Sequence, residues 1–560
     1  MSRTGPLLLW LTFAGPLAMI AVAPLSRRPL RLLPWAAVPG LATALLAPLD
    51  IAMEQPAVLL GLHLRLDRMA AVFLAFGSLL WVLAGAYAQS YLAGSGHARS
   101  FAVFWLLTLA GLLGVVLAAD VVTLYAAFSL MSLATFGLVI HDRTASARRA
   151  GLVYIVLAVL GEITLVAALM LAASGADSLL FADVSAAVAR SPWSTAILAG
   201  LLVGFGIKVG LVPLHVWLPL AHPEAPTPAS AVLSGVIVKA GIIGLMRLVP
   251  ADGMPDAWTE MVVVLGVVTA YYGVLVGLTQ TDAKAILAYS TLSQMGLLVA
   301  VLASGLAAKA AGTLDAVTLY ASHHGLAKGA LFLAIGVVAA CGARWRGPVL
   351  VVTALAALAI AGLPLSGGAF AKLAIKDVAG AGATGTLVAV SAVGTALLML
   401  RFLQVLSRAP GKPAETANWG LLVPWAAAAA AAFAVPVLWG PDLAGKPAAA
   451  AMSVHGLWTA AWPILFALAA AVFVLWRRWR IPLAIPRGDL VVLGETLLRR
   501  IGAGLGRLNA RLARLFQRRR RWPAPSFDGL DTLEAALRRW NLAGPALVLV
   551  AALIAIALTI

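Results

Sequence analysis

Long apolar segments separated by short polar loops recur along almost the whole chain. Most of these segments have roughly 20 residues, the length that an α-helix needs to cross a bilayer. The pattern therefore predicts about sixteen transmembrane helices. The predicted spans are 5–24, 30–48, 69–90, 101–119, 121–140, 150–173, 194–217, 226–249, 258–279, 284–304, 316–341, 348–377, 383–408, 419–439, 460–477 and 542–559.

Composition supports a membrane protein and excludes a soluble one. Hydrophobic residues make up 62% of the chain and charged residues 11%, and the mean hydropathy is +0.98. A soluble domain has about a quarter of its residues charged. The first apolar run, Pro6–Pro24, is long enough to span, so we interpret it as a helix and not as a signal peptide. We therefore expect an all-α polytopic membrane protein. The single cysteine, Cys341, excludes disulfide frameworks, iron–sulfur ligation and thiolate zinc sites.

The net charge of +18 is concentrated in particular loops, which argues against nucleic acid as a partner. Basic residues follow odd-numbered helices, and acidic residues follow even-numbered ones. Lysine and arginine mark cytoplasmic loops, so the loops that follow odd-numbered helices are predicted to lie in the cytoplasm. Both termini are then predicted to lie outside the cytoplasm. The membrane is predicted to be the cell (inner) membrane. The basic residues are Arg27, Arg28, Arg31, Arg143, Arg148, Arg149, Arg344, Arg346, Arg408 and Lys412, and the acidic ones Asp177, Asp183, Asp252, Asp256 and Glu260.

The segment 478–541 is polar and rich in arginine, and it precedes a final predicted helix at 542–560. Leucines recur in it near helical spacing, from Leu497 to Leu515, with arginines between them. That pattern is typical of an amphipathic helix on the inner membrane surface, where Arg518–Arg521 would meet anionic headgroups of the lipid bilayer. The alternative is a solvated cytoplasmic loop.

Five basic side chains lie inside the predicted spans: Lys208, Lys239, His324, Lys328 and Lys372. Ionisable groups in hydrocarbon usually face a bundle interior, a partner or a water-filled cavity. A single lysine can extend its ammonium to the membrane interface. Several such lysines within one chain instead indicate a transport path across the membrane. A desolvated lysine releases its proton near neutral pH, and histidine titrates there already. These residue types favour protons over an organic substrate, which needs a shaped aromatic pocket. Glu162 and Arg401 are also expected within spans.

Two spans contain helix-breaking residues next to these lysines. Pro213 and Pro219 follow Lys208, while Pro364, Gly367 and Gly368 precede Lys372. Proline removes a backbone donor and clashes with the preceding turn, and non-helical backbone at membrane depth must be buried or line a wet cavity. Matched interruptions predict two inverted five-helix repeats. The predicted organisation is N-terminal helices 1–100, repeats 101–249 and 258–408, C-terminal helices 419–477, the basic segment 478–541 and a last helix 542–560.

Four motifs carry a resemblance to a known family. They are KVGLVPLHVWLP at 208–219 with AHPEAPTP at 221–228, DAK at 282–284 with AYST at 288–291 and SQMG at 293–296, HGLAK at 324–328, and GLPLSG at 362–367. In this order they resemble the antiporter-like subunits of respiratory complex I, Mrp-type sodium/proton antiporters and group 4 membrane-bound hydrogenases.

The resemblance implies about fourteen core helices with two inverted repeats, each holding a broken helix. It also implies that Lys208, Lys239 and Lys372 carry protons, and that His324 and Lys328 link two half-channels. Supporting or gating roles are expected for His215, His222, Glu224, Asp282, Lys284 and Arg401.

One position departs from the family pattern. The fifth helix usually carries a glutamate just before Leu-Met-Ser-Leu, where it pairs with the lysine of the broken helix. Here Ser129 precedes Leu130–Leu133, so that carboxylate is missing. Glu162 on the next helix is a candidate replacement. Alternatively, the first half-channel is altered or inactive.

The sequence favours a proton-translocating subunit of a larger complex I-like, hydrogenase-like or Mrp-like assembly. No nucleotide loop, cysteine cluster or haem motif is present, so we expect no cofactor and no catalytic centre in this chain. Redox chemistry would then reside on partner subunits with iron–sulfur clusters. The alternatives are a stand-alone cation/proton antiporter, for which intramembrane carboxylates are scarce, a membrane-embedded transferase using His222 and Glu224, and a proton-transport subunit for inorganic-carbon uptake.

Overall fold

The computed structural model describes residues 4–56, 61–250, 253–410, 417–445, 447, 449–477, 485–492 and 494–496. The chain forms two compact units, Met1–Val492 and Leu493–Ile560. The predicted last helix, 542–560, and Arg518–Arg521 lie outside the described residues, as does most of the basic segment. The fold described below is that of the first unit.

Fourteen segments in the described residues are long and apolar enough to cross a membrane, which confirms a polytopic helical protein. Most of their ends lie within a few residues of the predicted ones, but the span predicted at 348–377 ends at Ala361, and the one predicted at 194–217 is the shorter apolar helix Ser194–Val209. The first helices are α1 (Thr4–Val22), η1 (Pro29–Leu32), η2 (Trp35–Ala37), α2 (Val38–Leu46), α3 (Arg68–Tyr91), α4 (Ala98–Leu117), α5 (Val121–Val139), α6 (Ala145–Ala173), α7 (Phe181–Arg190) and α8 (Ser194–Val209). The later ones are α9 (Trp217–Glu224), α10 (Thr227–Val232), η3 (Leu233–Ile237), α11 (Lys239–Leu248), α12 (Asp256–Thr279), α13 (Ala283–Ala307), α14 (Thr313–Ala340), α15 (Ala343–Ala361), α16 (Gly367–Ala379), α17 (Ala383–Ser407), α18 (Trp419–Ala444), α19 (Ala449–Met452) and α20 (Val454–Trp476).

The fold is not entirely helical. A two-stranded antiparallel sheet between α2 and α3 pairs β1 (Ile51–Gln55) with β2 (Leu62–Leu66). Side chains of β2 alternate between buried and more exposed positions, which is the period of a half-buried strand. The hairpin was not predicted from the sequence, because five alternating residues are a weak signal beside long apolar runs.

Both helices that the prolines were expected to interrupt are broken. α8 ends at Gly210, whose φ of +88° suits glycine, and Pro213 lies in the connection to α9. Pro219 lies in the first turn of α9, which forms the second half of the broken helix. Proline is tolerated there because the first turn of a helix has no intrahelical partner for its N–H groups.

The second break has the same form. α15 ends at Gly362, with φ +99°, and Pro364 lies in the connection to α16. Gly367 and Gly368 are the first residues of α16. At Gly368 an added Cβ would lie only 1.7 Å from the carbonyl oxygen of Ala359, so the two half-helices meet backbone to backbone.

That close approach predicts the effect of one methyl group. Gly368→Ala forces the half-helices apart, and we expect it to destabilise the protein by about 1–3 kcal/mol, as overpacking of a core does. Gly382→Ala is the control because nothing lies within 4 Å of a Cβ there. Thermal unfolding of both variants in detergent measures the difference. Equal unfolding temperatures would contradict the tight contact at Gly368.

The predicted span 226–249 is also interrupted, which the sequence did not reveal. A π-helical turn, η3, separates α10 from α11. Such turns carry an extra residue, change the direction of side chains and are frequent at functional sites. Here the turn lies directly before Lys239.

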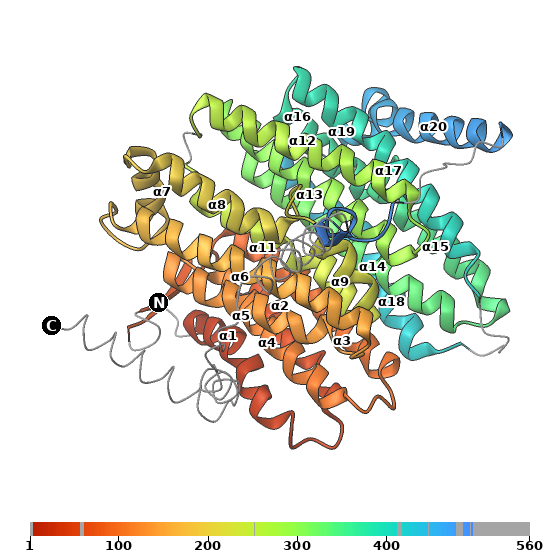
Figure 1. Ribbon diagram of the computed structural model, residues 1–560, viewed down its shortest axis with the longest axis horizontal. Coiled ribbons are helices and arrows are strands. Elements are labelled where there is room, and N and C mark those ends of the chain that lie inside the picture. Colours follow the sequence, from red (N-terminus) through yellow and green to blue (C-terminus); the bar gives the residue numbers. More distant parts are fainter. Residues whose placement is uncertain are drawn as a thin grey trace, which may run out of the picture. The chain divides into compact units, whose positions relative to one another are not determined.

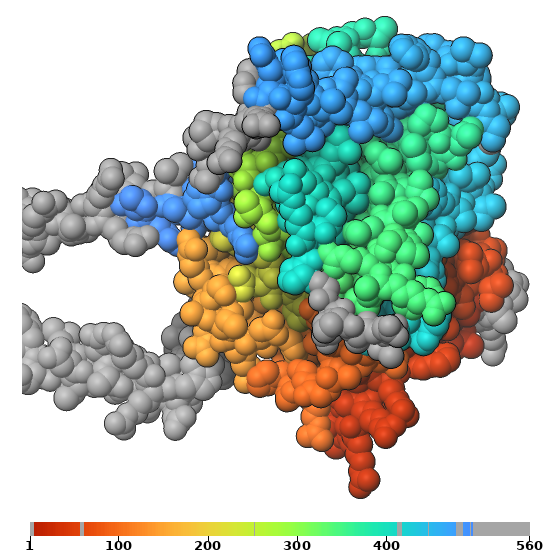
Figure 2. Space-filling model, turned by 90° about the vertical axis from the view of Figure 1, so that its right-hand side faces the viewer, coloured from red at the N-terminus to blue at the C-terminus, as the bar shows by residue number. Residues whose placement is uncertain are grey.

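The centre of the bundle is formed by α10–α11, α13 and α14. The apolar windows of 227–248 and of α13 are completely buried. Figure 1 places α11 and α14 between the red and orange N-terminal helices and the green helices α12 and α17. Only 17% of the corresponding window of α20 is buried, and Figure 2 shows blue side chains of this region along an outer surface. The buried centre therefore holds Lys239 of α11 and His324 and Lys328 of α14.

Candidate functional site

Lys239 and His324 lie in contact at the centre of the bundle. The Lys239 Nζ atom is 2.9 Å from His324 Nδ1 and donates to the Ser234 carbonyl oxygen at 2.5 Å. Both side chains are buried, with 0% and 1% of their surfaces exposed. When Lys239 is an ammonium it donates to Nδ1 of His324, and when it is a neutral amine it can accept from an Nδ1–H group. The π-helical turn presents the Ser234 oxygen to the ammonium five residues along the chain, which fixes Lys239 against α14.

α14 carries two further buried groups next to His324. Lys328 donates to the Leu287 carbonyl oxygen of α13 at 3.1 Å. The preceding residue, His323, has Nδ1 3.3 Å from the Ala432 carbonyl oxygen of α18. Its Nε2 would lie 2.7 Å from a Cβ at Gly368, so the ring abuts the second break. His323 was not selected from the sequence, although it stands directly before His324 of the HGLAK motif.

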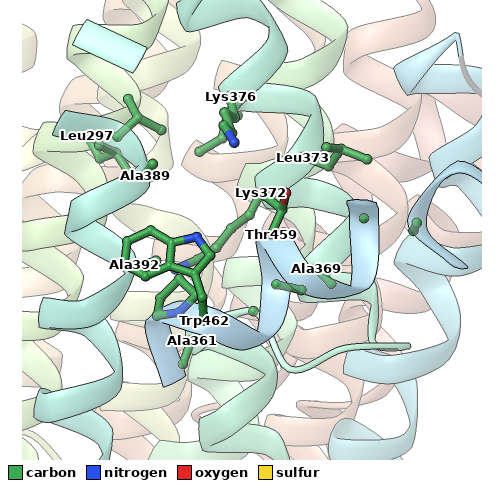
Figure 3. Close-up of a pocket in the computed structure, with 17 residues that line it drawn as sticks. Leu297, Ala361, Ala369, Lys372, Leu373, Lys376, Ala389, Ala392, Thr459 and Trp462 are labelled. Atoms are coloured by element: carbon green, nitrogen blue, oxygen red, sulfur yellow. The ribbon is translucent and has the colours of Figure 1, made fainter. Parts of the chain in front are cut away.

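Lys372 reaches a cavity beside the second break. Within the described residues its Nζ atom has no hydrogen-bond partner. The cavity has a volume of about 40 Å³, which holds roughly three water molecules. Figure 3 shows Lys372 extending into it, with Lys376 at one side and Trp462 and Thr459 of α20 at another. His323 is the histidine of α14 that abuts the start of α16, the helix that carries Lys372.

Lys208 occupies an aromatic cage at the end of α8, where 3% of its surface is exposed. Its Nζ atom donates to the Tyr154 hydroxyl at 3.3 Å and lies 5.4 Å from the ring centres of Phe128 and Tyr154. Trp217, the first residue of α9, lies 5.9 Å away. Cation–π contacts of this kind stabilise an ammonium that has left water.

A buried carboxylate accompanies Lys208. Glu162 of α6 is 7% exposed and interacts electrostatically with Lys208. The hydroxyls of Ser129 and Ser132 on α5 also interact with this carboxylate, although neither reaches good hydrogen-bond geometry. Ser129 of α5, where the family usually has a glutamate, therefore lies near the carboxylate of Glu162 on α6.

The residues predicted to support the path lie mainly at the helix connections. His222 stacks on Phe332, with ring centres 4.7 Å apart. Lys284 donates to the Ala225 carbonyl oxygen at 2.6 Å, and Glu224 accepts from Ser146 at 2.8 Å. These contacts tie α9 to the start of α13 and to α6.

Arg401 is not part of the central group. It lies in α17 and donates to the Gln280 carbonyl oxygen at 3.0 and 3.2 Å and to Gln404 at 2.7 Å. Asp282 caps α13 by accepting from the Ala285 N–H at 2.9 Å. Both residues therefore have structural partners at the ends of helices.

His215 lies in the first break and is fully buried. Its Nε2 atom is 3.3 Å from a carboxylate oxygen of Asp489, a residue that the sequence analysis did not select. Asp489 is 274 positions away along the chain, so no local pattern connects the two. Within the described ranges, no group of three or more His, Cys, Asp or Glu side chains is arranged to hold a metal ion.

Comparison with known proteins places the chain in a family of membrane proteins. Residues 118–398 match the family model described as NADH:quinone oxidoreductase/Mrp antiporter, transmembrane. Hydrogenase-4 component B of Escherichia coli is 32% identical over 294 residues, covering 50% of this chain and 43% of that protein. The putative antiporter subunit mnhA2 of Staphylococcus saprophyticus is 31% identical over 340 residues, covering 56% and 42%. The chain thus spans less than half the length of these two relatives.

A solved structure extends the similarity to nearly all of the chain. One chain of the Mrp complex from a Dietzia species has a TM-score of 0.69 and 26% identity, covering 96% of this chain and 60% of that one. These findings confirm the resemblance carried by the four motifs. Since the family match covers half of its residues, the chain belongs to the NADH:quinone oxidoreductase/Mrp antiporter transmembrane family.

Proposed function

We propose that the chain translocates protons across the membrane as an antiporter-like subunit of a complex I-like, hydrogenase-like or Mrp-like assembly. The observation that supports this most directly is the 2.9 Å contact between Lys239 and His324 in the buried centre of the bundle. Either group can hold a proton, and a hydrogen bond between two such groups is a route for proton transfer. An ion path for sodium would instead need several oxygen ligands.

The proton path in this proposal joins two half-channels through α14. Lys208 with Glu162 forms the first station, Lys239 and His324 the central one, and His323 leads toward Lys372 and its cavity. Lys328 holds α14 against α13 through the Leu287 carbonyl oxygen. We further propose that 101–249 and 258–408 are inverted repeats. In support, each region has its interruption in the fourth of five spans, α8–α9 and α15–α16.

Glu162 serves as the counter-ion of Lys208 in this proposal, in place of a carboxylate at Ser129. Glu162→Gln removes the charge with little change of shape, and we expect proton flux to fall by about tenfold, the effect of losing one charge-assisted interaction. Flux is measured in liposomes with a trapped pH-sensitive dye. Glu162→Gln combined with Ser129→Glu returns a carboxylate from α5 and should recover part of the flux.

Glu162→Asp is the matched control, because it keeps the charge and shortens the side chain by one methylene. We expect it to retain more flux than Glu162→Gln. A Glu162→Gln protein with normal flux at every pH would exclude Glu162 as the counter-ion. It would leave Lys208 stabilised by the aromatic cage alone.

We also propose that the chain works with other membrane subunits, and with iron–sulfur redox subunits if the assembly is complex I-like or hydrogenase-like. The names of a hydrogenase component and of the Mrp complex among its relatives support this. The chain would be a multi-pass protein of the cell inner membrane with both termini outside the cytoplasm.

Purification of the tagged chain in mild detergent from its own membranes, followed by identification of co-purifying proteins, tests the assembly. Iron–sulfur or quinone-linked partners would place it in a redox-driven pump, and antiporter subunits alone in an Mrp-type exchanger. A soluble zinc protein would indicate inorganic-carbon uptake. Recovery as a single chain that conducts protons in liposomes would contradict the subunit proposal and support a stand-alone transporter.

A further inference from the structure

The segment 485–492 follows α20 in sequence and packs against the first broken helix. The Ile485 carbonyl oxygen accepts from the Gln280 side chain at 3.0 Å. Beside it, an added Cβ at Gly488 would lie 2.8 Å from the Leu220 side chain of α9. The segment therefore contacts both α9 and the end of α12.

An ion pair holds the same segment at its rim. Arg487 Nη2 lies 3.3 Å from an oxygen of Asp282, the capping residue of α13, and the two side chains are 44% and 33% exposed. Exposed pairs of this kind contribute at most about 1 kcal/mol. This pair holds the edge of the segment. Its stabilising free energy is too small to account for the burial of the carboxylate next to it.

That carboxylate belongs to Asp489, which is 4% exposed. Three donors from three parts of the fold converge on one of its oxygens: Tyr272 of α12 at 2.6 Å, Tyr289 of α13 at 3.1 Å, and His215 of the break at 3.3 Å. A buried carboxylate is tolerated only when it is hydrogen-bonded or paired. The site around Asp489 meets that requirement.

The carboxylate is charged at neutral pH. Burial by itself would raise the pKa of Asp489, but the hydrogen bond from His215, the attraction of that ring when it is protonated and the hydroxyl of Tyr272 outweigh it and hold the pKa below its ordinary value. The titratable and charged groups around it are His215, Tyr272 and Tyr289, with Arg487 and Asp282 at the rim.

We propose that Asp489 is a positioning residue for proton transfer at the first broken helix, acting through His215. By accepting from the Nε2–H of His215, it fixes the tautomer in which Nδ1 carries the lone pair. Within the described residues, that Nδ1 atom is buried and has no partner, so it is free to accept a proton. When the ring is protonated, Asp489 supplies the counter-charge. This inference rests on the proposed function and adds to it a segment from beyond the repeats.

Asp489→Asn tests the proposal, since the amide has nearly the same shape and its oxygen still accepts from the tyrosine hydroxyls. The full chain, with whatever subunits co-purify, is placed in liposomes, and proton uptake is driven by a valinomycin–potassium diffusion potential. We expect flux to fall by about tenfold, as loss of one charged hydrogen bond implies, and its pH profile to change, since the charge next to the His215 ring is gone. Asp489→Glu should restore most of the flux.

Two further measurements separate positioning from mere docking. Cysteines at Asp282 and Arg487, in a Cys341→Ala background, are bridged with a short bis-maleimide, and we expect the same yield with and without Asp489→Asn. Arg487→Ala, which removes only the rim ion pair, should keep flux within about twofold of the parent.

The outcomes are distinguishable. Normal flux and an unchanged pH profile in Asp489→Asn would overturn the role of Asp489. A drop in flux accompanied by loss of the cross-link in Asp489→Asn would also overturn it, because Asp489 would then only anchor the segment. If liposomes that contain the parent protein show no proton flux, the proposed function itself fails instead.

Discussion

Proton flux through liposomes that contain the Lys208→Ala protein is expected to fall by about a hundredfold or more, the range in which loss of a proton-transferring group usually lies. Lys208 is the ionisable side chain at the end of α8, held by the Tyr154 hydroxyl and by the charge of Glu162. Alanine leaves no group at that position to take up or release a proton. The measurement is dye-reported flux normalised to protein, with assembly checked by native gel electrophoresis.

The alanine variant also leaves Glu162 without its partner, which by itself destabilises a buried site. Lys208→Met separates the two effects, because methionine keeps most of the volume against the three rings. We expect it to assemble normally and to conduct as little as the alanine variant. Lys309→Gln, an exposed lysine in the turn after α13, is the control that should conduct normally. Unchanged flux in assembled Lys208→Ala protein would exclude Lys208 as a carrier.

A loss of similar size, about a hundredfold, is expected when Lys239 is replaced by methionine. This change removes the ammonium from its 2.9 Å contact with His324 at the centre of the bundle. It also leaves the Ser234 carbonyl oxygen without its lysine donor, for which we expect a stability loss of about 1–3 kcal/mol. That loss is modest beside the effect on transfer, so native assembly should persist.

A double variant makes the test of the central contact more specific. If Lys239 and His324 act in one path, Lys239→Met combined with His324→Gln should conduct no less than Lys239→Met alone, since residues that act as a unit are strongly non-additive. Multiplicative losses would mean that the two side chains serve separate routes. Full flux in Lys239→Met would remove Lys239 from the path.

The carboxylate near Lys208 could be predicted only in part from the sequence. The absence of a glutamate at Ser129 was visible in the sequence, and Glu162 was one of two open interpretations. Burial and the interaction with Lys208 favour Glu162, because helices α5 and α6 bring the two positions to the same lysine. That outcome depends on how the helices are rotated against each other, which periodicity within one apolar helix does not specify.

Features that depend only on neighbouring residues could be predicted from the sequence. Runs of apolar residues long enough to span must be helical in lipid, because backbone groups there have no water to bind. Proline breaks a helix for steric reasons, and both predicted breaks are present, each with a glycine shortly before its proline. The basic side chains inside apolar runs could also be recognised from their neighbours in the sequence.

Which of the candidate side chains contact one another depends on the tertiary structure. Lys239 and His324 are 85 positions apart, and His215 and Asp489 are 274 apart. The π-helical turn before Lys239, the β1–β2 hairpin and the contacts of His323 also follow from packing. Contacts between distant residues are set by the sum of many helix–helix interfaces, where small residues allow close approach. No single stretch of sequence contains that sum, so the pairing of the candidate side chains could only be read from the folded chain.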